Sequence, residues 1–162
     1  MTAATSFPSA VRGDARLLIL GSLPGAASLA AREYYAHPRN QFWKLLEAVL
    51  DRPLVALAYP DRLGALREGG IGLWDVVKSA RRVGSLDADM RDITANDLPE
   101  LVRRLPDLRA IAFNGGTAHR IGSRQLAAAH PALIPLPSSS PAYAAMPFES
   151  KRAIWAGLRS YL

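Results

Sequence analysis

Short apolar runs, each ended by a glycine or a polar turn, recur along this chain and constrain its fold more than any other feature. They predict strands at residues 16–20, 71–77, 108–113 and 132–136. Stretches with helical spacing of apolar side chains separate them. Because strands that alternate with helices pair in parallel, we expect an α/β fold with three α/β/α layers and a short, mainly parallel four-stranded sheet.

The segments between these runs predict the helices and one long loop. The predicted helices cover residues 26–32, 40–50, 60–68, 96–105, 117–126 and 148–162. Asn40 and Asn96 stand where a helix N-cap is expected. In the last helix we expect Ile154, Trp155, Leu158 and Leu162 to point inward. The polar, basic segment 78–92 has no periodicity and is predicted to be a surface loop.

Size and composition favour one folded domain. The chain has 162 residues, of which 49% are hydrophobic and 21% charged, which is too apolar for a disordered chain. We expect a partly ordered N-terminal arm over residues 1–14 and a single domain over residues 15–162.

Charge and cysteine usage narrow the class of protein. A net charge of +6 and a pI near 10.2 make an anionic partner plausible without naming it. With no cysteine, disulfides, thiolate zinc sites, iron–sulfur clusters and a cysteine nucleophile are excluded. The first residues lack a signal-peptide pattern and no apolar run is long enough to span a membrane, so we expect a cytoplasmic protein.

Three loops that follow predicted strands carry the candidate chemistry. These loops are residues 21–25, 114–116 and 137–141. Ligands of parallel α/β sheets bind beyond the carboxyl ends of the strands, so the three loops are expected to meet at one cleft.

Two other kinds of site find little support. A catalytic triad would need a nucleophilic serine beside His37, His119 or His130, but no GxSxG turn is present. The same histidines lack the spacing of a metal site. We therefore expect no metal and no serine nucleophile.

Four strings in a fixed order resemble those of a known family. GSLPGAASL at 21–29, YYAHPRNQFW at 34–43, AFNGG at 112–116 and LPSSSPA at 136–142 together resemble the uracil-DNA glycosylase superfamily across nearly the whole chain. Within it, they are most similar to the hypoxanthine (deoxyinosine) DNA glycosylase group. The resemblance implies a monomeric, monofunctional repair enzyme that needs no cofactor, flips deaminated bases out of damaged DNA, chiefly hypoxanthine, and hydrolyses their N-glycosidic bonds.

The resemblance also assigns the two catalytic residues. Where superfamily members that act on uracil carry an Asn or Asp in the first loop, this chain has Ser22. The role of positioning the attacking water therefore passes to Asn40, whose alternative role is to cap the helix. The resemblance implies that Asn114 reads the base through its amide, and we expect a backbone group near Gly115 to hold this amide in one orientation. The alternative is that Asn114 is only a turn residue.

The remaining site residues follow from the same likeness. Tyr35 is implied to stack on the flipped base, with a core aromatic as the alternative, whereas Phe42 and Trp43 are expected in the core. Further base-binding residues are Gly21, Ser22, Leu23, Pro24, Gly25 and His37; DNA-binding residues are Arg39, Ser138, Ser139, Ser140 and Pro141. Arg81, Arg82 and Arg91 are either phosphate contacts or an ordinary solvated face.

Two alternatives remain open at this point. A mismatch-specific uracil/thymine glycosylase would share the same four strings. A damaged-DNA-binding module without catalysis is the other, because fold does not fix function and Ser22 replaces the usual catalytic residue.

Overall fold

A four-stranded parallel sheet forms the centre of the computed structural model, which describes residues 2–127 and 131–162. Its strands lie in the order β3-β2-β6-β7, and each neighbouring pair is parallel. They are β2 (Leu17–Gly21), β3 (Ile71–Asp75), β6 (Ala110–Asn114) and β7 (Ala132–Leu136). The predicted α/β fold and its four-stranded sheet are confirmed.

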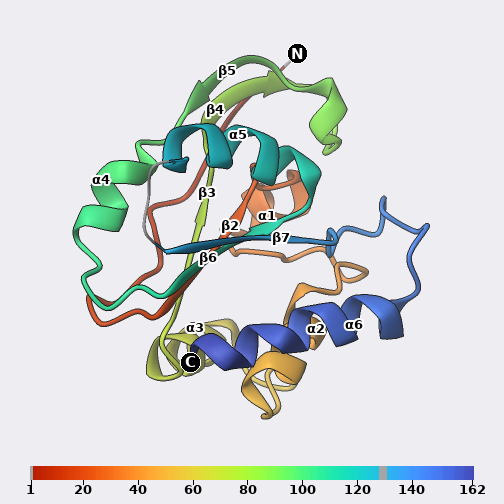
Figure 1. The fold of residues 1–162 in the computed structure, drawn as a ribbon. Coiled ribbons are helices and arrows are strands. Elements are labelled where there is room, and N and C mark those ends of the chain that lie inside the picture. The colour runs from red at the N-terminus through yellow and green to blue at the C-terminus, as the bar shows by residue number, and fades with distance from the viewer. Residues whose placement is uncertain (1, 128–130) are drawn as a thin grey trace.

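Helices cover both faces of this sheet (Figure 1). On one face lie α2 (Phe42–Leu50), α3 (Tyr59–Glu68) and α6 (Phe148–Ala156); on the other lie α4 (Leu98–Arg103) and α5 (Gly116–Leu126). Helix α1 (Ala26–Ala31) follows β2, and two 3₁₀ turns occupy Asp87–Asp89 and Gly157–Tyr161.

Successive side chains of β2 enter two separate cores. Leu17 and Ile19 pack with Phe42 and Trp155 in one core, whereas Leu18 and Leu20 belong to the other. All five residues of β2 are buried, as expected for the inner strand of a covered parallel sheet. The expected core positions of Phe42 and Trp43 are confirmed.

A second, antiparallel sheet was not predicted. It contains β1 (Thr2–Thr5), β4 (Val77–Arg82) and β5 (Arg91–Ala95) in the order β1-β4-β5. The predicted loop over 78–92 is therefore wrong, and the predicted arm over 1–14 contributes a strand. Half of the residues of β4 and all residues of β5 are outside the buried core. Because these residues include many charged side chains, the sequence lacks the apolar run by which a strand is predicted.

Three details of the helices and strands differ from the sequence-based prediction. The apolar run 71–77 divides at Val76, which separates β3 from β4. Asp97, rather than Asn96, caps α4 by accepting a hydrogen bond from the Glu100 N–H. Ile154 is 45% exposed, whereas Trp155 and Leu158 are buried as predicted.

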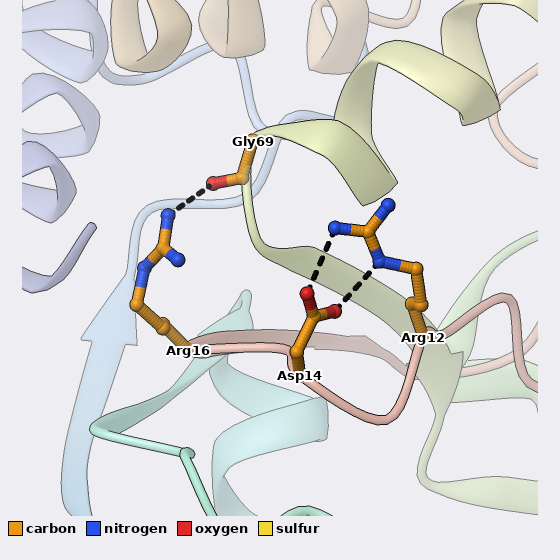
Figure 2. Close-up of polar contacts among 4 residues, drawn as sticks. All are labelled: Arg12, Asp14, Arg16 and Gly69. Atoms are coloured by element: carbon orange, nitrogen blue, oxygen red, sulfur yellow. Dashed lines mark hydrogen bonds and ion pairs between the residues drawn. The ribbon is translucent and has the colours of Figure 1, made fainter.

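The amino ends of β2 and β3 are held together away from any predicted site. Figure 2 shows the Arg16 guanidinium donating to the Gly69 carbonyl, 3.3 Å away, beside an exposed ion pair between Arg12 and Asp14. The backbone N–H groups of Arg16 and Leu17 both donate to the Gly70 carbonyl. These contacts fix the register that places Gly21 opposite Asp75 at the other end of the strands.

Candidate active site

A cavity of about 620 Å³ opens at the carboxyl ends of the parallel strands. Strands β2 and β6 are neighbours at the middle of the sheet. From β2 the chain continues to β3 on one side, and from β6 it continues to β7 on the other side. Such a reversal of strand order creates a crevice between the two middle strands. All fourteen predicted site residues line the cavity: Gly21, Ser22, Leu23, Pro24, Gly25, Tyr35, His37, Arg39, Asn40, Asn114, Ser138, Ser139, Ser140 and Pro141. The predicted convergence of the three loops is confirmed.

Ser139 joins Asn40 to Asn114. Its hydroxyl donates to Asn40 Oδ1 at 2.8 Å and accepts from Asn114 Nδ2 at 2.9 Å. Its backbone N–H donates to Asn114 Oδ1 at 2.9 Å. Three segments distant in the sequence therefore meet in one hydrogen-bonded unit at the cavity wall.

Asn40 takes part in this unit through its amide oxygen. Besides the Ser139 hydroxyl, Oδ1 accepts the Phe42 N–H at 3.0 Å, so both of its lone pairs are occupied. The N-cap of α2 is Gln41 rather than Asn40. Asn40 precedes the N-cap, but its side chain still accepts a hydrogen bond from the first N–H of the helix, that of Phe42. Its Nδ2 group makes no hydrogen bond within the described part of the chain, which makes this N–H pair the part of Asn40 available to a ligand.

Ser139 fixes the Asn114 amide through its backbone N–H and its hydroxyl, so a backbone group takes part as predicted, although it is not that of Gly115 itself. The Gly115 N–H donates instead to the Phe113 and Leu136 carbonyls. Gly115 has φ +97°, and a Cβ atom there would lie 3.2 Å from Ser138 Cβ. Because Ser139 engages both the oxygen and the nitrogen of the amide, Asn114 keeps one N–H and one lone pair for a ligand.

Tyr35 lines the cavity with one face of its ring covered. The ring stacks on Phe42 at a centroid distance of 3.8 Å and an angle of 16°. The residue has φ +56°, an uncommon conformation for a bulky side chain that is often found at functional sites. The stack holds the ring rigidly at the cavity wall.

His37 and Arg39 are set by a tight turn ahead of α2. The Arg39 N–H donates to His37 Nδ1 at 3.1 Å, so the proton of a neutral His37 ring is on Nε2. The Arg39 side chain is exposed at the cavity. His119 packs edge-on against Phe113, and His130 lies outside the described residues.

The loop after β7 divides into an inner and an outer part. Ser139 is completely buried, so the predicted phosphate contact of its side chain is wrong. Pro141 is exposed and Ser138 and Ser140 are half-buried; the hydroxyls of these two serines accept backbone N–H groups within the loop. The outer residues remain the ones that can reach DNA.

The first loop is held by residues that sequence reasoning did not connect to it. Ser22 Oγ donates to Asp87 Oδ1 at 2.7 Å, and the Arg82 guanidinium donates to the Pro24 carbonyl. Arg82 is only 4% exposed, so its predicted role on a phosphate-binding or solvated face is wrong. Burial lowers its pKa, while the carboxylates of Asp87 and Asp75 raise it.

Asp75 is the lining residue that sequence reasoning missed. It ends β3 beside Gly21 and is 3% exposed. Burial, reinforced by the charge of Asp87 and opposed by that of Arg82, raises the pKa of Asp75 to about 7. A single charged residue at the end of an apolar strand was the available signal, since the same rule had selected Gly21 and Asn114.

Neither a cluster of metal ligands nor a helix fit to span a membrane is found in the described part of the chain. Across residues 2–127 and 131–162, no three His, Asp or Glu side chains are grouped as metal ligands would be. No helix in the same part of the chain has the length and apolar character needed to cross a membrane.

Comparisons with known proteins agree on one family. A family model described as the uracil DNA glycosylase superfamily matches residues 8–159. Hypoxanthine DNA glycosylases from Methanosarcina barkeri and Methanosarcina acetivorans are each 40% identical, over 67% and 69% of this chain and 69% and 71% of theirs. The solution NMR structure of a candidate uracil DNA glycosylase from Methanosarcina acetivorans is 34% identical, covers 99% of both chains and has a TM-score of 0.89.

Proposed function

Because the chain belongs to the uracil DNA glycosylase superfamily, we propose that it is a monofunctional DNA glycosylase that hydrolyses the N-glycosidic bond of deaminated bases, chiefly hypoxanthine. The observation that carries this proposal is the Asn40–Ser139–Asn114 unit on the wall of the cavity of about 620 Å³. Relatives named hypoxanthine DNA glycosylase support hypoxanthine as the principal base.

The base enters the cavity after it is flipped out of the DNA. The Tyr35 ring, backed by Phe42, offers a stacking surface at the wall, and stacking is worth about 1 to 3 kcal/mol per base against a similar cost of unstacking. The remaining N–H of Asn114 can donate to a carbonyl of the base. We propose damaged DNA as the substrate, and a monomeric enzyme that needs no cofactor.

Asn40 holds the attacking water. With its oxygen occupied by Phe42 and Ser139, one N–H of its amide donates to the water oxygen. The other lone pair of the water is then free to attack the anomeric carbon. Such weak activation suffices when the bond to the base breaks first and the sugar becomes oxocarbenium-like. Asn40 contributes through orientation rather than by removing a proton.

DNA contacts the rim of the cavity. The exposed Arg39 and Pro141 and the half-buried Ser138 and Ser140 face the opening. Their cationic group, hydroxyls and backbone amides are the kinds of groups that bind phosphate oxygens.

One assay separates the candidate activities. Duplex oligonucleotides that contain a single hypoxanthine, uracil, xanthine or mismatched thymine are incubated with the enzyme, and the released base is measured. We expect hypoxanthine to be released fastest. Faster release of uracil or mismatched thymine would identify a mismatch-specific enzyme, and binding without release of any base would identify a non-catalytic DNA-binding protein.

Asn40→Ala tests the catalytic assignment. We expect single-turnover release of hypoxanthine to decrease by about 10² or more, because an oriented water is lost, while DNA affinity changes little. The matched control is Ser150→Ala, an exposed residue of α6 outside the cavity. An Asn40→Ala enzyme as fast as this control would refute the role of Asn40.

A further inference from the structure

Asp75 and Tyr35 place oxygen atoms where Gly21 leaves space at the inner end of the cavity. A Cβ atom on Gly21 would lie 2.6 Å from Asp75 Oδ1 and 2.7 Å from the Tyr35 hydroxyl oxygen. Asp75 Oδ2 is buried and has no hydrogen-bond partner among the described residues. Because a buried carboxylate oxygen without a partner is costly, this position favours the neutral carboxyl. Its other oxygen, Oδ1, is the one that lies beside the space left by Gly21.

The surrounding charges favour a proton on Asp75 rather than on Asp87. Arg82 acts on both carboxyl groups, whereas Arg120 and the hydrogen bond from Ser22 lower the pKa of Asp87 alone. Asp75 has no such donor among the described residues and is the more deeply buried of the two. Its other neighbours include the neutral phenols of Tyr34 and Tyr35. Of two neighbouring buried carboxyl groups, the one with fewer cations and donors keeps its proton more readily.

We propose that Asp75 is a general acid for base release, an inference that rests on the proposed function. As the bond from the sugar C1′ to the base nitrogen breaks, its electron pair stays on the base. The neutral Asp75 carboxyl transfers its proton to an acceptor atom of the leaving base and becomes a carboxylate. The water held by Asn40 adds to C1′ and releases a proton to solvent, from which Asp75 is reprotonated when the product leaves.

Asp87, Arg39 and Asn114 also line the cavity but are less suited to this step. Asp87 Oδ1 is committed to Ser22, and Arg39 is exposed at the opening. Asn114 has one N–H left, which can stabilise charge but cannot give up a proton. A buried neutral acid beside a developing anion is also effective electrostatically.

The inference predicts a pH dependence with a definite sign. Burial raises the pKa of Asp75 to about 7, so the neutral form is lost as the pH rises through that value. Wild-type single-turnover release of hypoxanthine should decrease by about ten-fold for each pH unit above it, because only the acid form supports the step.

Asp75→Asn is the principal test. The amide keeps the size and hydrogen-bonding capacity of the carboxyl but cannot transfer a proton. We expect single-turnover release at pH 6 to decrease by about 10² or more and the descending arm of the pH profile to disappear. Affinity for DNA that contains an uncleavable 2′-fluoroarabino hypoxanthine nucleotide should stay within about three-fold of wild type. A wild-type rate, a retained arm, or an affinity loss as large as the rate loss would overturn the proposal.

Asp87→Asn provides a second test that does not alter Asp75 itself. The negative charge of Asp87 raises the pKa of Asp75, so its removal should shift the descending arm to lower pH. An unmoved arm would also overturn the inference. Failure of the wild-type enzyme to release any deaminated base would instead refute the proposed function, and the two failures are thereby distinguished.

Discussion

Asp75 imposes a cost on the folded protein that depends on pH. Its pKa is about 7 in the folded chain against an ordinary value of 3.8. Between these values the folded chain binds a proton that the unfolded chain has released, so the free energy of unfolding decreases as the pH rises from 4 to 7. A carboxyl kept at such a cost is typical of a functional site rather than of the core.

Asp75→Asn should therefore stabilise the protein at high pH. We expect the variant to exceed the wild type in free energy of unfolding by about 2 to 4 kcal/mol at pH 8, with the difference vanishing near pH 4. Urea denaturation at the two pH values measures this. An equal difference at both pH values would show that packing, not ionisation, is responsible.

Ser139→Ala should break the hydrogen-bonded connection between Asn40 and Asn114. The substitution removes the hydroxyl that bridges Asn40 and Asn114 while the backbone N–H of residue 139 still holds Asn114 Oδ1. We expect a loss of about 1 to 3 kcal/mol in stability, because buried polar groups lose a partner, and a decrease in base release of at least ten-fold. Thermal unfolding and single-turnover kinetics test it against Ser160→Ala, whose hydroxyl is exposed outside the cavity.

At the scale of elements, the loop after β7 depends on a buried cation in α6. Lys151 is 2% exposed and donates to the Tyr143 carbonyl at 2.8 Å and to Gln41 Oε1 at 3.1 Å. It thereby connects the outer part of this loop to the start of α2, next to Asn40. Burial lowers the pKa of Lys151.

Lys151→Met should loosen this connection while its apolar length keeps the packing. We expect faster hydrogen exchange at residues 141–146 and about ten-fold slower base release, because small displacements at a catalytic site are costly. The control is Lys44→Met, an exposed position on α2. Unchanged exchange in the loop would contradict the role given to Lys151.

Elements differ in how far their sequences reveal them. Strands β2, β3 and β6 were predictable because both of their faces are buried and their runs are mainly apolar. The edge strand β7 is partly exposed, but its short run is also mainly apolar. Strands β4 and β5 were not predictable, since β4 buries only three of its six residues, without regular alternation, and β5 buries none. The pairing of β4 with β1 is a long-range contact that local pattern does not encode. Likewise, the loops of the site were predictable, whereas the engagement of both Asn40 lone pairs and the location of Asp75 depended on tertiary structure.

For the whole molecule, the net charge of +6 should make DNA binding sensitive to salt. We expect affinity for undamaged DNA to decrease by about 10- to 100-fold between 50 and 200 mM salt, as for a protein with few phosphate contacts. Arg39→Ala should reduce the slope of log affinity against log salt by about 1. Fluorescence anisotropy measures both, and a slope unaffected by Arg39→Ala would remove this residue from the DNA interface.

The bridge through Ser139 also bears on how activity is acquired during folding. Its three residues come from segments that are far apart in the sequence, and Ser139 comes after β7, the last strand of the parallel sheet. The side chains of Asn40 and Asn114 therefore cannot be oriented by Ser139 before β7 has docked beside β6. An incompletely folded chain is then catalytically silent rather than partly active. Recovery of base release after dilution from urea would consequently report the completion of the sheet and trail any signal from the earlier strands.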